Sequence, residues 1–322
     1  SCLSPEASMK EKVENIDFFY NDFISSYTER EINKFDIVHA HYWLSGVVAE
    51  KIKQEFNIPF VFTAHSLGLF TQDQNIPHDR VSQERQIMLD SDAVTASSNF
   101  ELDFINEHYD IPKSKIVKIT PGVNENIFSP NEGYRTSNIK KIFCVGRIQE
   151  QKGQHLVLDF MQLLNKLNIN FHIYFVGDPS GEDGFQYLQK IKKRIKENKF
   201  SNQTTFLGSL SQESLAKELR DSDLLLHTSE YETFGLVAVE ANACGVPVLT
   251  TNKGSMNELV SNNINGFITD DFKNDDLNEF IKSLFTYDQE LISIRKNSFE
   301  KSKDYSWEKT GEYISELYKN LI

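Results

Sequence analysis

The sequence predicts an α/β protein in which parallel β-sheets are covered by helices. Short runs rich in β-branched and aromatic residues alternate along the chain with segments of helix length. Strands that are separated by helices form parallel sheets, because the chain must cross back before the next strand can begin. At 322 residues the chain also exceeds the size at which a single core usually stops growing. Two domains are therefore expected.

Ten strands are expected, four in the first part of the chain and six in the second. The first four are 35–42, 59–65, 92–98 and 115–122. The other six are 141–148, 171–178, 204–210, 223–229, 246–252 and 265–270. The expected helices include 44–57, 153–168, 185–198 and 211–221.

A polar segment without apolar periodicity, residues 126–140, separates the two parts and contains Pro130 and Gly133. We expect a first domain over 1–128 and a second over 129–305. A C-terminal helix over 306–322 is expected to pack back toward the first domain.

The charge balance excludes some partners. There are 34 basic and 47 acidic residues, a net charge of -13, which disfavours a nucleic acid as the main partner. An anionic ligand must therefore be held by locally placed cations. The three cysteines, Cys2, Cys144 and Cys244, are odd in number and indicate free thiols in a reducing, cytoplasmic compartment. No apolar run approaches the roughly 18 residues of a membrane span, so no transmembrane segment is expected.

The segment 228–250 carries the first candidate site, in which a strand ends, a loop contains Glu232 and a helix begins near Phe234 or Gly235. A helix start exposes unpaired N–H groups and the positive end of the helix dipole, which suits a phosphate. Glu240, further into the helix, could accept hydrogen bonds from two ribose hydroxyls. The alternative is an ordinary strand–loop–helix with two surface glutamates.

The segment 145–153 carries the second candidate site. A strand ends at Gly146, Arg147 follows at once, and Lys152 and Gly153 are expected to open the next helix. Two cations at the carboxyl end of a strand can converge on a diphosphate in the crevice where open α/β sheets bind ligands. A solvated loop with two charges would give the same pattern.

Taken together, these segments resemble a known family. Gly-Arg, four residues and Lys-Gly are followed roughly eighty residues later by Glu-x-Phe-Gly, four residues and Glu-Ala-x-Ala-x-Gly-x-Pro-Val. This order resembles the group 1 family of retaining nucleotide-sugar glycosyltransferases across most of residues 35–322. The resemblance implies the GT-B fold, two facing Rossmann-like domains with the active site in the cleft between them.

The resemblance also assigns roles to residues of the second domain. It implies that Arg147 and Lys152 bind the donor diphosphate, that Glu232 contacts the transferred sugar and that Glu240 binds the ribose. It further implies that the donor is contacted by backbone or small residues at strand and helix ends: Gly146, Gly177, Ser209, Leu210, Phe234, Gly235 and Leu236. The loop at Gly208 resembles the one against which the base rests.

The motifs HAHYWLSG (39–46) and TAHS (63–66) resemble the mycothiol-pathway N-acetylglucosaminyltransferases and, more distantly, the sucrose-phosphate synthases. That similarity implies that His65 lies beside the transferred sugar and that Tyr42, Ser66 and Arg80 face the acceptor. The same similarity favours a donor with a uridine nucleotide over one with guanosine. Family members usually begin with a strand and a Gly-rich loop, and neither is visible before Ile37. We therefore expect a shortened first domain. Three alternatives stay open: the chain is a fragment, a partner chain completes the domain, or part of the domain has been lost.

His39, His41 and His65 raise the alternative of a metal-dependent hydrolase, but no carboxylate or cysteine set completes such a site, so no metal is expected. The expected reaction is transfer of a hexose or N-acetylhexosamine, with retention and without cofactor, to a hydroxyl acceptor. The acceptor can be a small molecule, phosphorylated or not, a sugar or a lipid-linked molecule. The competing hypothesis is a donor-binding, catalytically deficient subunit that supports a partner.

Overall fold

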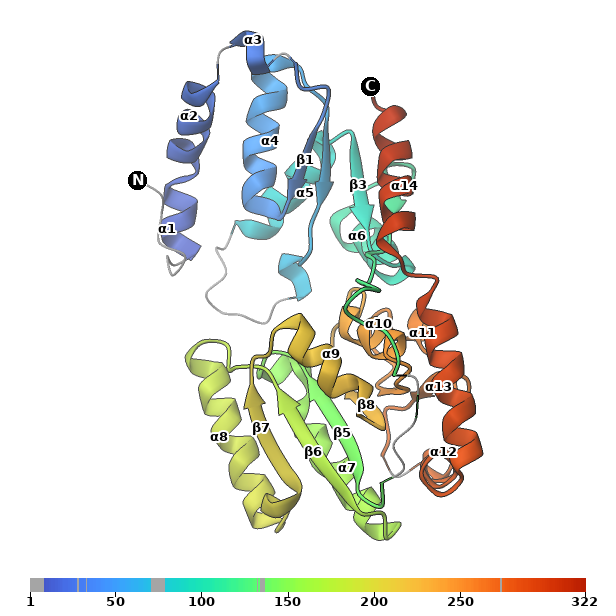
Figure 1. Cartoon of the computed structure of the whole chain (residues 1–322). Helices are drawn as coiled ribbons and strands as arrows, with labels where there is room; N and C mark the ends of the chain where they lie inside the picture. Colours follow the sequence, from blue (N-terminus) through green and yellow to red (C-terminus); the bar gives the residue numbers. More distant parts are fainter. Residues whose placement is uncertain are drawn as a thin grey trace. The chain divides into compact units, whose positions relative to one another are not determined.

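The computed structural model describes residues 9–322 except 28, 33, 71–78, 132, 134–136 and 273. The chain forms two compact units (Figure 1). Residues up to Thr120, together with Gly311–Ile322, make the first unit, and Pro121–Thr310 make the second.

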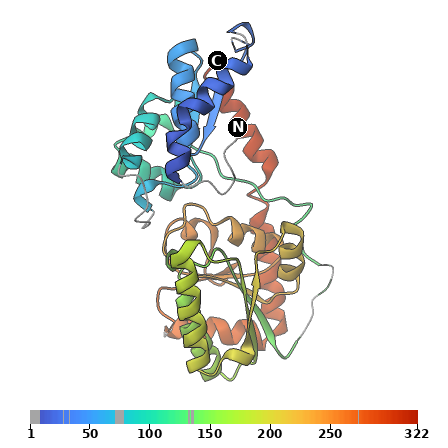
Figure 2. The ribbon, with the colours of Figure 1, turned by 90° about the vertical axis from the view of Figure 1, so that its left-hand side faces the viewer.

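The first unit contains a four-stranded parallel sheet in the order β1-β2-β3-β4. Its strands are β1 (Val38–His41), β2 (Phe60–Thr63), β3 (Ala93–Ala96) and β4 (Ile116–Lys118). Its helices are α1 (Met9–Glu14), α2 (Ile16–Ser26), α3 (Glu29–Ile32), α4 (Trp43–Phe56), α5 (Arg80–Asp90) and α6 (Asn99–Tyr109). The last helix of the chain, α14 (Trp307–Lys319), joins this unit from Gly311 onward (Figures 1 and 2).

Both faces of the first sheet are buried. Phe60 and Phe62 point into a core shared with α4, α5 and α6, whereas Val61 points to the opposite face and packs with Leu317 of α14. Side chains alternate between the faces of a strand, so a strand covered on both sides must be apolar at nearly every position. This requirement explains the uninterrupted apolar run of β2.

The second unit contains a six-stranded parallel sheet in the order β10-β9-β8-β5-β6-β7. Its strands are β5 (Lys140–Val145), β6 (Phe171–Val176), β7 (Thr204–Gly208), β8 (Leu224–His227), β9 (Val248–Thr250) and β10 (Gly266–Ile268). Its helices of four or more residues are α7 (Val157–Lys166), α8 (Gly181–Glu197), α9 (Gln212–Arg220), α10 (Leu236–Ala243), α11 (Met256–Leu259), α12 (Asp275–Thr286) and α13 (Asp288–Ser302).

This sheet also has a core on each face. Phe143 and Leu225 belong to the core that contains α10, whereas Ile142 and Leu224 belong to the core that contains α7 and α12. The two cysteines within the described residues, Cys144 and Cys244, are buried free thiols, as expected from their apolar surroundings. Burial raises the pKa of both thiols to about 12, which makes them unreactive at neutral pH. Cys2 lies outside the described residues.

All ten predicted strands are confirmed, and so is the α/β fold class. The predicted helix over 153–168 is wrong at its start, because the chain first makes two 3-10 turns, Glu150–Lys152 and Gln154–Leu156, before α7 begins at Val157. Gly153 separates these turns at a φ of 63°, and a Cβ there would lie 2.0 Å from the Thr228 carbonyl oxygen. The left-handed conformation of Gly153 therefore interrupts the helix, and the close approach of Thr228 leaves no room for a side chain there.

The chain enters the second unit at Pro121, whereas the sequence places the start of the second domain at residue 129. Val123 and Phe128 are both buried in the core of the second unit. The residues around them are mostly polar, so the sequence shows no apolar pattern there. Among the described residues, no helix is long and apolar enough to cross a membrane.

Candidate active site

Three neighbouring strands of the second sheet end in glycine. Gly146 follows β5, Gly177 follows β6 and Gly208 ends β7, and all three have positive φ angles. A Cβ on Gly177 would lie 2.1 Å from the Gly146 carbonyl oxygen, so only glycine allows these two backbones to approach so closely. No side chain from these positions covers the carboxyl edge of the sheet. A ligand can therefore approach the backbone there.

The loop between β8 and α10 carries Glu232, whose carboxylate is bound by two basic side chains. Oε2 of Glu232 lies 2.9 Å from Nζ of Lys152 and 3.2 Å from Nε2 of His227. Burial alone would raise the pKa of Glu232, but the hydrogen bond from His227 and the charge of Lys152 lower it to about 2. Glu232 is thus held as a carboxylate, and Lys152 belongs to the same cluster.

A second turn, at Gly254 and Ser255, braces the loop that carries Glu232 by packing against its backbone. Gly254 has a φ of 64°, and a Cβ there would lie 2.0 Å from the Glu232 carbonyl oxygen. Ser255 is fully buried, its amide donates to the Glu232 carbonyl at 3.0 Å, and its hydroxyl donates to the Phe234 carbonyl at 2.8 Å. The position of the Glu232 side chain therefore depends on this turn as well as on its ionic partners.

Helix α10 begins where the sequence placed a helix start. Its N-cap is Gly235 at a φ of 94°, and no side chain caps the first turn. Within the described part of the chain, we find no hydrogen-bond acceptor for the amides of Phe234, Gly235 or Leu236. Unpaired amides at a helix N-terminus carry partial positive charge and can bind an anion.

Glu240 lies one turn into α10 and is 6% exposed. Burial raises its pKa to about 7, and no hydrogen-bond donor for its carboxyl group is found among the described residues. A buried carboxyl without donors is costly, and ligand hydroxyls could supply the missing hydrogen bonds.

Arg147 lies directly after Gly146 and is exposed. Its carbonyl accepts a hydrogen bond from Nε2 of Gln154 at 2.8 Å, which fixes the backbone, and its guanidinium makes no ion pair with another described residue. Ser209 is exposed after β7, and Leu210 is partly buried against the core of the second unit. The structure therefore brings the predicted donor residues of the second unit to one end of its sheet.

The three predicted acceptor residues of the first unit also lie together. The buried Arg80 donates through Nε to Glu84 at 2.7 Å and through one terminal nitrogen to the carbonyl and hydroxyl of Ser66, both at 3.0 Å. Its guanidinium carbon lies 5.3 Å from the centre of the Tyr42 ring. Arg80 is thus tied to Glu84, a partner that the sequence analysis did not identify.

His65 follows β2 on the first sheet and is exposed. Tyr42 and His65 have φ angles of 74° and 56°, a left-handed conformation that is unfavourable for residues other than glycine. Such conformations concentrate at functional sites, where the surrounding structure enforces them. Both residues lie directly beyond the carboxyl ends of neighbouring strands, where ligands of α/β sheets bind.

The described residues contain no group of three or more His, Cys, Asp or Glu side chains arranged to hold a metal ion. His41 and His65 instead bond to each other, with Nδ1 of His41 2.8 Å from Nε2 of His65.

Sequence reasoning missed His227 and Ser255. The alternation in β8 places Leu225 and His227 on one face, which suggests a core residue rather than a partner of Glu232. Ser255 follows a glycine in a loop, which indicates a turn but not what the turn supports.

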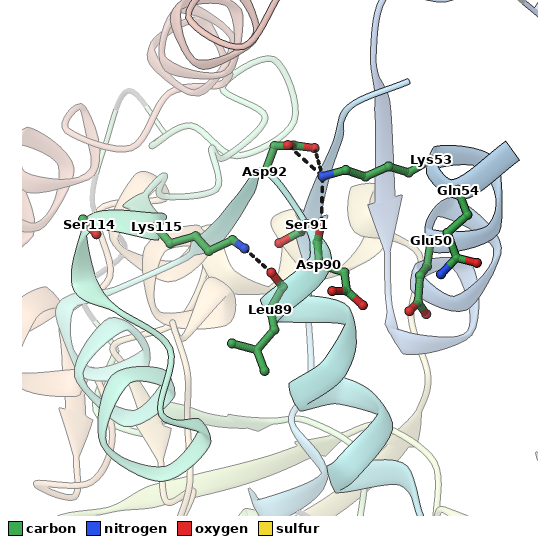
Figure 3. A pocket seen from close by; sticks show the side chains of 9 residues that line it. All are labelled: Glu50, Lys53, Gln54, Leu89, Asp90, Ser91, Asp92, Ser114 and Lys115. Atoms are coloured by element: carbon green, nitrogen blue, oxygen red, sulfur yellow. Dashed lines mark hydrogen bonds and ion pairs between the residues drawn. The ribbon is translucent and has the colours of Figure 1, made fainter. Parts of the chain in front are cut away.

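A hollow of about 630 Å³ in the first unit is lined by residues other than Tyr42, His65, Ser66 and Arg80 (Figure 3). Its lining comes from the second half of α4 and from residues just before β3 and β4, including Lys53, Asp92 and Lys115. Nζ of Lys53 is 2.8 Å from both carboxylate oxygens of Asp92 (Figure 3). This hollow is at the amino ends of the strands, whereas α/β sheets bind ligands at the carboxyl ends.

Comparison with known proteins agrees with this geometry. Residues 129–301 match the family described as glycosyl transferases group 1, and residues 15–126 match glycosyltransferase family 4. The D-inositol 3-phosphate glycosyltransferase of Corynebacterium urealyticum is 28% identical over 316 residues, which cover 92% of this chain and 74% of that protein. The corresponding enzyme of Rhodococcus jostii is 29% identical and covers 88% of this chain and 66% of its own length.

Solved structures show the same fold. Sucrose-phosphate synthase of Thermosynechococcus elongatus has a TM-score of 0.82 at 24% identity, covering 99% of this chain and 81% of that one. Anabaena HepE, solved with UDP and glucose, has a TM-score of 0.77 at 20% identity, covering 98% and 84%. At identities below 25%, structural similarity shows only a shared fold. The assignment to a family depends on the match of residues 129–301 to the family model. The chain belongs to the glycosyl transferases group 1, has the GT-B fold and is a glycosyltransferase that transfers a sugar from a nucleotide sugar.

Proposed function

We propose that this glycosyltransferase moves a hexose or N-acetylhexosamine from a UDP-sugar to a hydroxyl of its acceptor, with retention at the anomeric carbon and without a metal. The observation that carries the proposal is the cluster of Glu232, Lys152 and His227 beside the uncapped start of α10. The cluster combines a carboxylate that can accept hydrogen bonds from sugar hydroxyls, the ammonium group of Lys152 and backbone amides without an acceptor among the described residues. These are the groups that a sugar diphosphate requires.

Each group has a proposed role. The carboxylate of Glu232 accepts hydrogen bonds from the hydroxyls of the transferred sugar, and the amides of Phe234 to Leu236 donate to sugar and phosphate. Lys152 has three N–H donors and uses one on Glu232, so it can bind a phosphate oxygen at the same time. Arg147 supplies the second cation, and Glu240 accepts from the ribose hydroxyls.

The proposed reaction proceeds on one face of the sugar. The glycosidic bond to the diphosphate breaks as the acceptor oxygen approaches, and the leaving phosphate oxygen takes the acceptor's proton. Arg147, Lys152 and the start of α10 stabilise the charge that develops on the diphosphate. Glu232 is fully ionised and paired, which suits a hydroxyl acceptor better than a proton donor. His65 is proposed to contact the transferred sugar.

The names of relatives support the choice of substrates. Several are D-inositol 3-phosphate glycosyltransferases, and HepE was solved with UDP. We therefore propose a UDP-sugar donor and a phosphorylated polyol acceptor, with Tyr42, Ser66 and Arg80 on the acceptor side. Because the charge of Arg80 is already balanced by Glu84, acceptor binding is best tested with Ser66→Ala and Tyr42→Phe. Unchanged acceptor affinity in both variants would remove this part of the proposal.

The deciding experiment is a donor screen by thermal shift with UDP, GDP and their glucose and N-acetylglucosamine derivatives. A ligand at one hundred times its dissociation constant adds about 2.7 kcal/mol of stability. Glu232→Gln should lose the preference for the sugar nucleotide over free UDP, whereas the matched control Glu230→Gln should keep it. Stabilisation by GDP-sugars alone would contradict the uridine assignment.

The preferred donor is then incubated with inositol phosphates or with water alone, and the anomeric configuration of the product is read by NMR. Turnover that persists in EDTA supports the metal-independent route. Inversion of the anomeric centre would overturn the retaining mechanism. Donor binding without transfer or hydrolysis would instead favour the alternative of a donor-binding subunit that supports a partner.

A further inference from the structure

Three histidines of the first unit form a continuous stack at the carboxyl ends of β1 and β2. The rings of His39 and His41 are stacked with centroids 4.2 Å apart, and those of His41 and His65 with centroids 5.0 Å apart. His65 comes from the residues after β2, whose register pairs His41 with Thr63. The parallel pairing of these strands therefore delivers all three rings to one place.

The contact between His41 and His65 is directional as well as apolar. Nδ1 of His41 and Nε2 of His65 are 2.8 Å apart, which is a hydrogen-bond distance. Between two neutral imidazoles such a bond contains one proton, so one ring donates and the other accepts. If His41 donates, His65 must have its own proton on Nδ1. If His65 donates, its Nδ1 is a free lone pair.

We propose that His41 is a positioning residue that fixes the ring orientation and the tautomer of His65. The proposal deepens the role given to His65 above and rests on that proposed function. It follows that Nδ1 is the nitrogen of His65 that faces substrate, because Nε2 is occupied by His41. To pass from the first arrangement to the second, the shared proton must move to Nε2 of His65 while Nδ1 of His65 releases its proton and Nε2 of His41 takes one up.

The surroundings keep the pair neutral. Burial lowers the pKa of His41, and burial together with the neighbouring His41 lowers the pKa of His65. His39, the third ring of the stack, has its pKa lowered to about 4 by burial and by the other two histidines. Near neutral pH the bond therefore joins two uncharged rings, as the tautomer argument requires.

Among the described residues, titratable groups of α14 and α5 also approach these histidines or their neighbours. The hydroxyl oxygen of Tyr318, on α14, lies 2.6 Å from Nδ1 of His39, and burial raises the pKa of this hydroxyl. Arg80 of α5 reaches Ser66, the residue after His65, and lies over the Tyr42 ring. Arg80 is neutralised by Glu84, so protonation within the stack is governed mainly by the histidines themselves.

His39 provides a matched control. It stacks on His41 and lies on the same strand, but its two ring nitrogens are engaged by Tyr318 and by the Thr63 hydroxyl, the latter at 2.8 Å. Neither of these nitrogens bonds to His65. A substitution at His39 should therefore disturb the stack without releasing Nε2 of His65.

The test combines NMR with kinetics on the full chain. In ¹⁵N-histidine-labelled protein, His41→Phe keeps an aromatic ring at this position but removes the bond to Nε2 of His65. It should change the ¹⁵N shifts that report the tautomer of His65, and it should raise the pKa of His65 only by the part that His41 contributes, because burial is kept. His41→Asn restores a polar group near the position of Nδ1 and should recover most of the wild-type spectrum. His39→Asn should leave the His65 titration unchanged.

The same variants are assayed with the preferred donor. His41→Phe should lower kcat on the order of 10- to 100-fold through misplacement of His65, with the KM for the donor nearly unchanged and with recovery in His41→Asn. A His65 titration and tautomer that are unchanged in His41→Phe would overturn the proposal. Because the NMR measurement needs no turnover, an altered spectrum without any sugar transfer in the wild type would refute only the proposed function.

Discussion

The carboxyl edges of the two sheets have the same parallel architecture but opposite chemistry. The second sheet ends in glycines and presents backbone, with Glu232 ionised between two cationic or polar donors. The first sheet ends in aromatic and imidazole side chains, and the buried Arg80 beside them is already neutralised by Glu84. A diphosphate needs close backbone approach and nearby cations, and the second edge offers both through its glycines, Arg147 and Lys152. The first edge instead offers directional side-chain donors and acceptors, which suit the hydroxyls of an acceptor.

The largest effect is expected on the first edge from Glu84→Ala. Glu84 is fully buried and binds Arg80 at 2.7 Å, the Gly68 amide at 2.8 Å and the Tyr109 hydroxyl at 2.6 Å. Its removal leaves a buried guanidinium unpaired, which costs about 3–5 kcal/mol. Urea unfolding followed by circular dichroism should show the loss in the transition of the first unit. The exposed Glu107→Ala is the control, and a loss below about 1 kcal/mol in Glu84→Ala would contradict the pairing.

The next effect concerns the two glutamates of the second edge, whose pKa values shift in opposite directions. The pKa of Glu240 is raised to about 7, so the folded state holds its proton more tightly than the unfolded chain. Stability from this group is therefore highest below pH 4.5 and falls as pH rises through 7, on the order of 3 kcal/mol in total.

Glu240→Gln should remove this pH dependence from the unfolding free energy measured between pH 4.5 and 8. The exposed Glu279→Gln should retain it. Glu232 behaves in the opposite sense, because its pKa is lowered to about 2 and its contribution is lost only as pH falls from 4.5 toward that value. An unchanged slope in Glu240→Gln would show that its carboxyl is not desolvated.

Arg147→Ala tests whether the exposed cation of the second edge acts on the diphosphate. Loss of a charged hydrogen bond should cost roughly 1.5–3 kcal/mol, or on the order of 10- to 100-fold in rate. Stability should change by less than about 0.5 kcal/mol, because the side chain is exposed. Steady-state kinetics at saturating donor provides the measurement, with Arg194→Ala on α8 as the control. Turnover close to wild type would sink the assignment.

The smallest expected effect comes from Gly254→Ala, which tests the brace behind Glu232. Its Cβ would lie 2.0 Å from the Glu232 carbonyl oxygen and must displace the loop. Gly181 has nearly the same φ, 65° against 64°, but a Cβ there meets nothing within 4 Å. Gly181→Ala therefore reproduces the backbone strain without the contact.

We expect Gly254→Ala to weaken donor binding by about 10-fold, equivalent to ~1.4 kcal/mol, and Gly181→Ala to leave it unchanged. Isothermal titration with the preferred donor measures both. Equal affinities in the two variants would show that the brace does not position Glu232.

The sequence by itself determined the ten strands, their parallel arrangement and the set of candidate donor residues at the strand ends. Periodicity reports burial, and burial on both faces of a sheet leaves a strong apolar signal. The residues at the strand ends are then brought to one edge by the topology, so Arg147, Lys152 and Glu232 could be grouped in advance.

Only the tertiary structure decided how these residues are partnered. In the sequence, His227 looks like a core residue of β8, Ser255 like a turn residue and Glu84 like a helix residue. In the structure, His227 bonds to Glu232, Ser255 supports the Glu232 loop and Glu84 pairs with Arg80. The pairing of His41 with His65 likewise depends on strands that are 24 residues apart in sequence at that point. Hydrogen bonds are set by distance and direction in space, and residues remote along the chain leave no periodic trace of them.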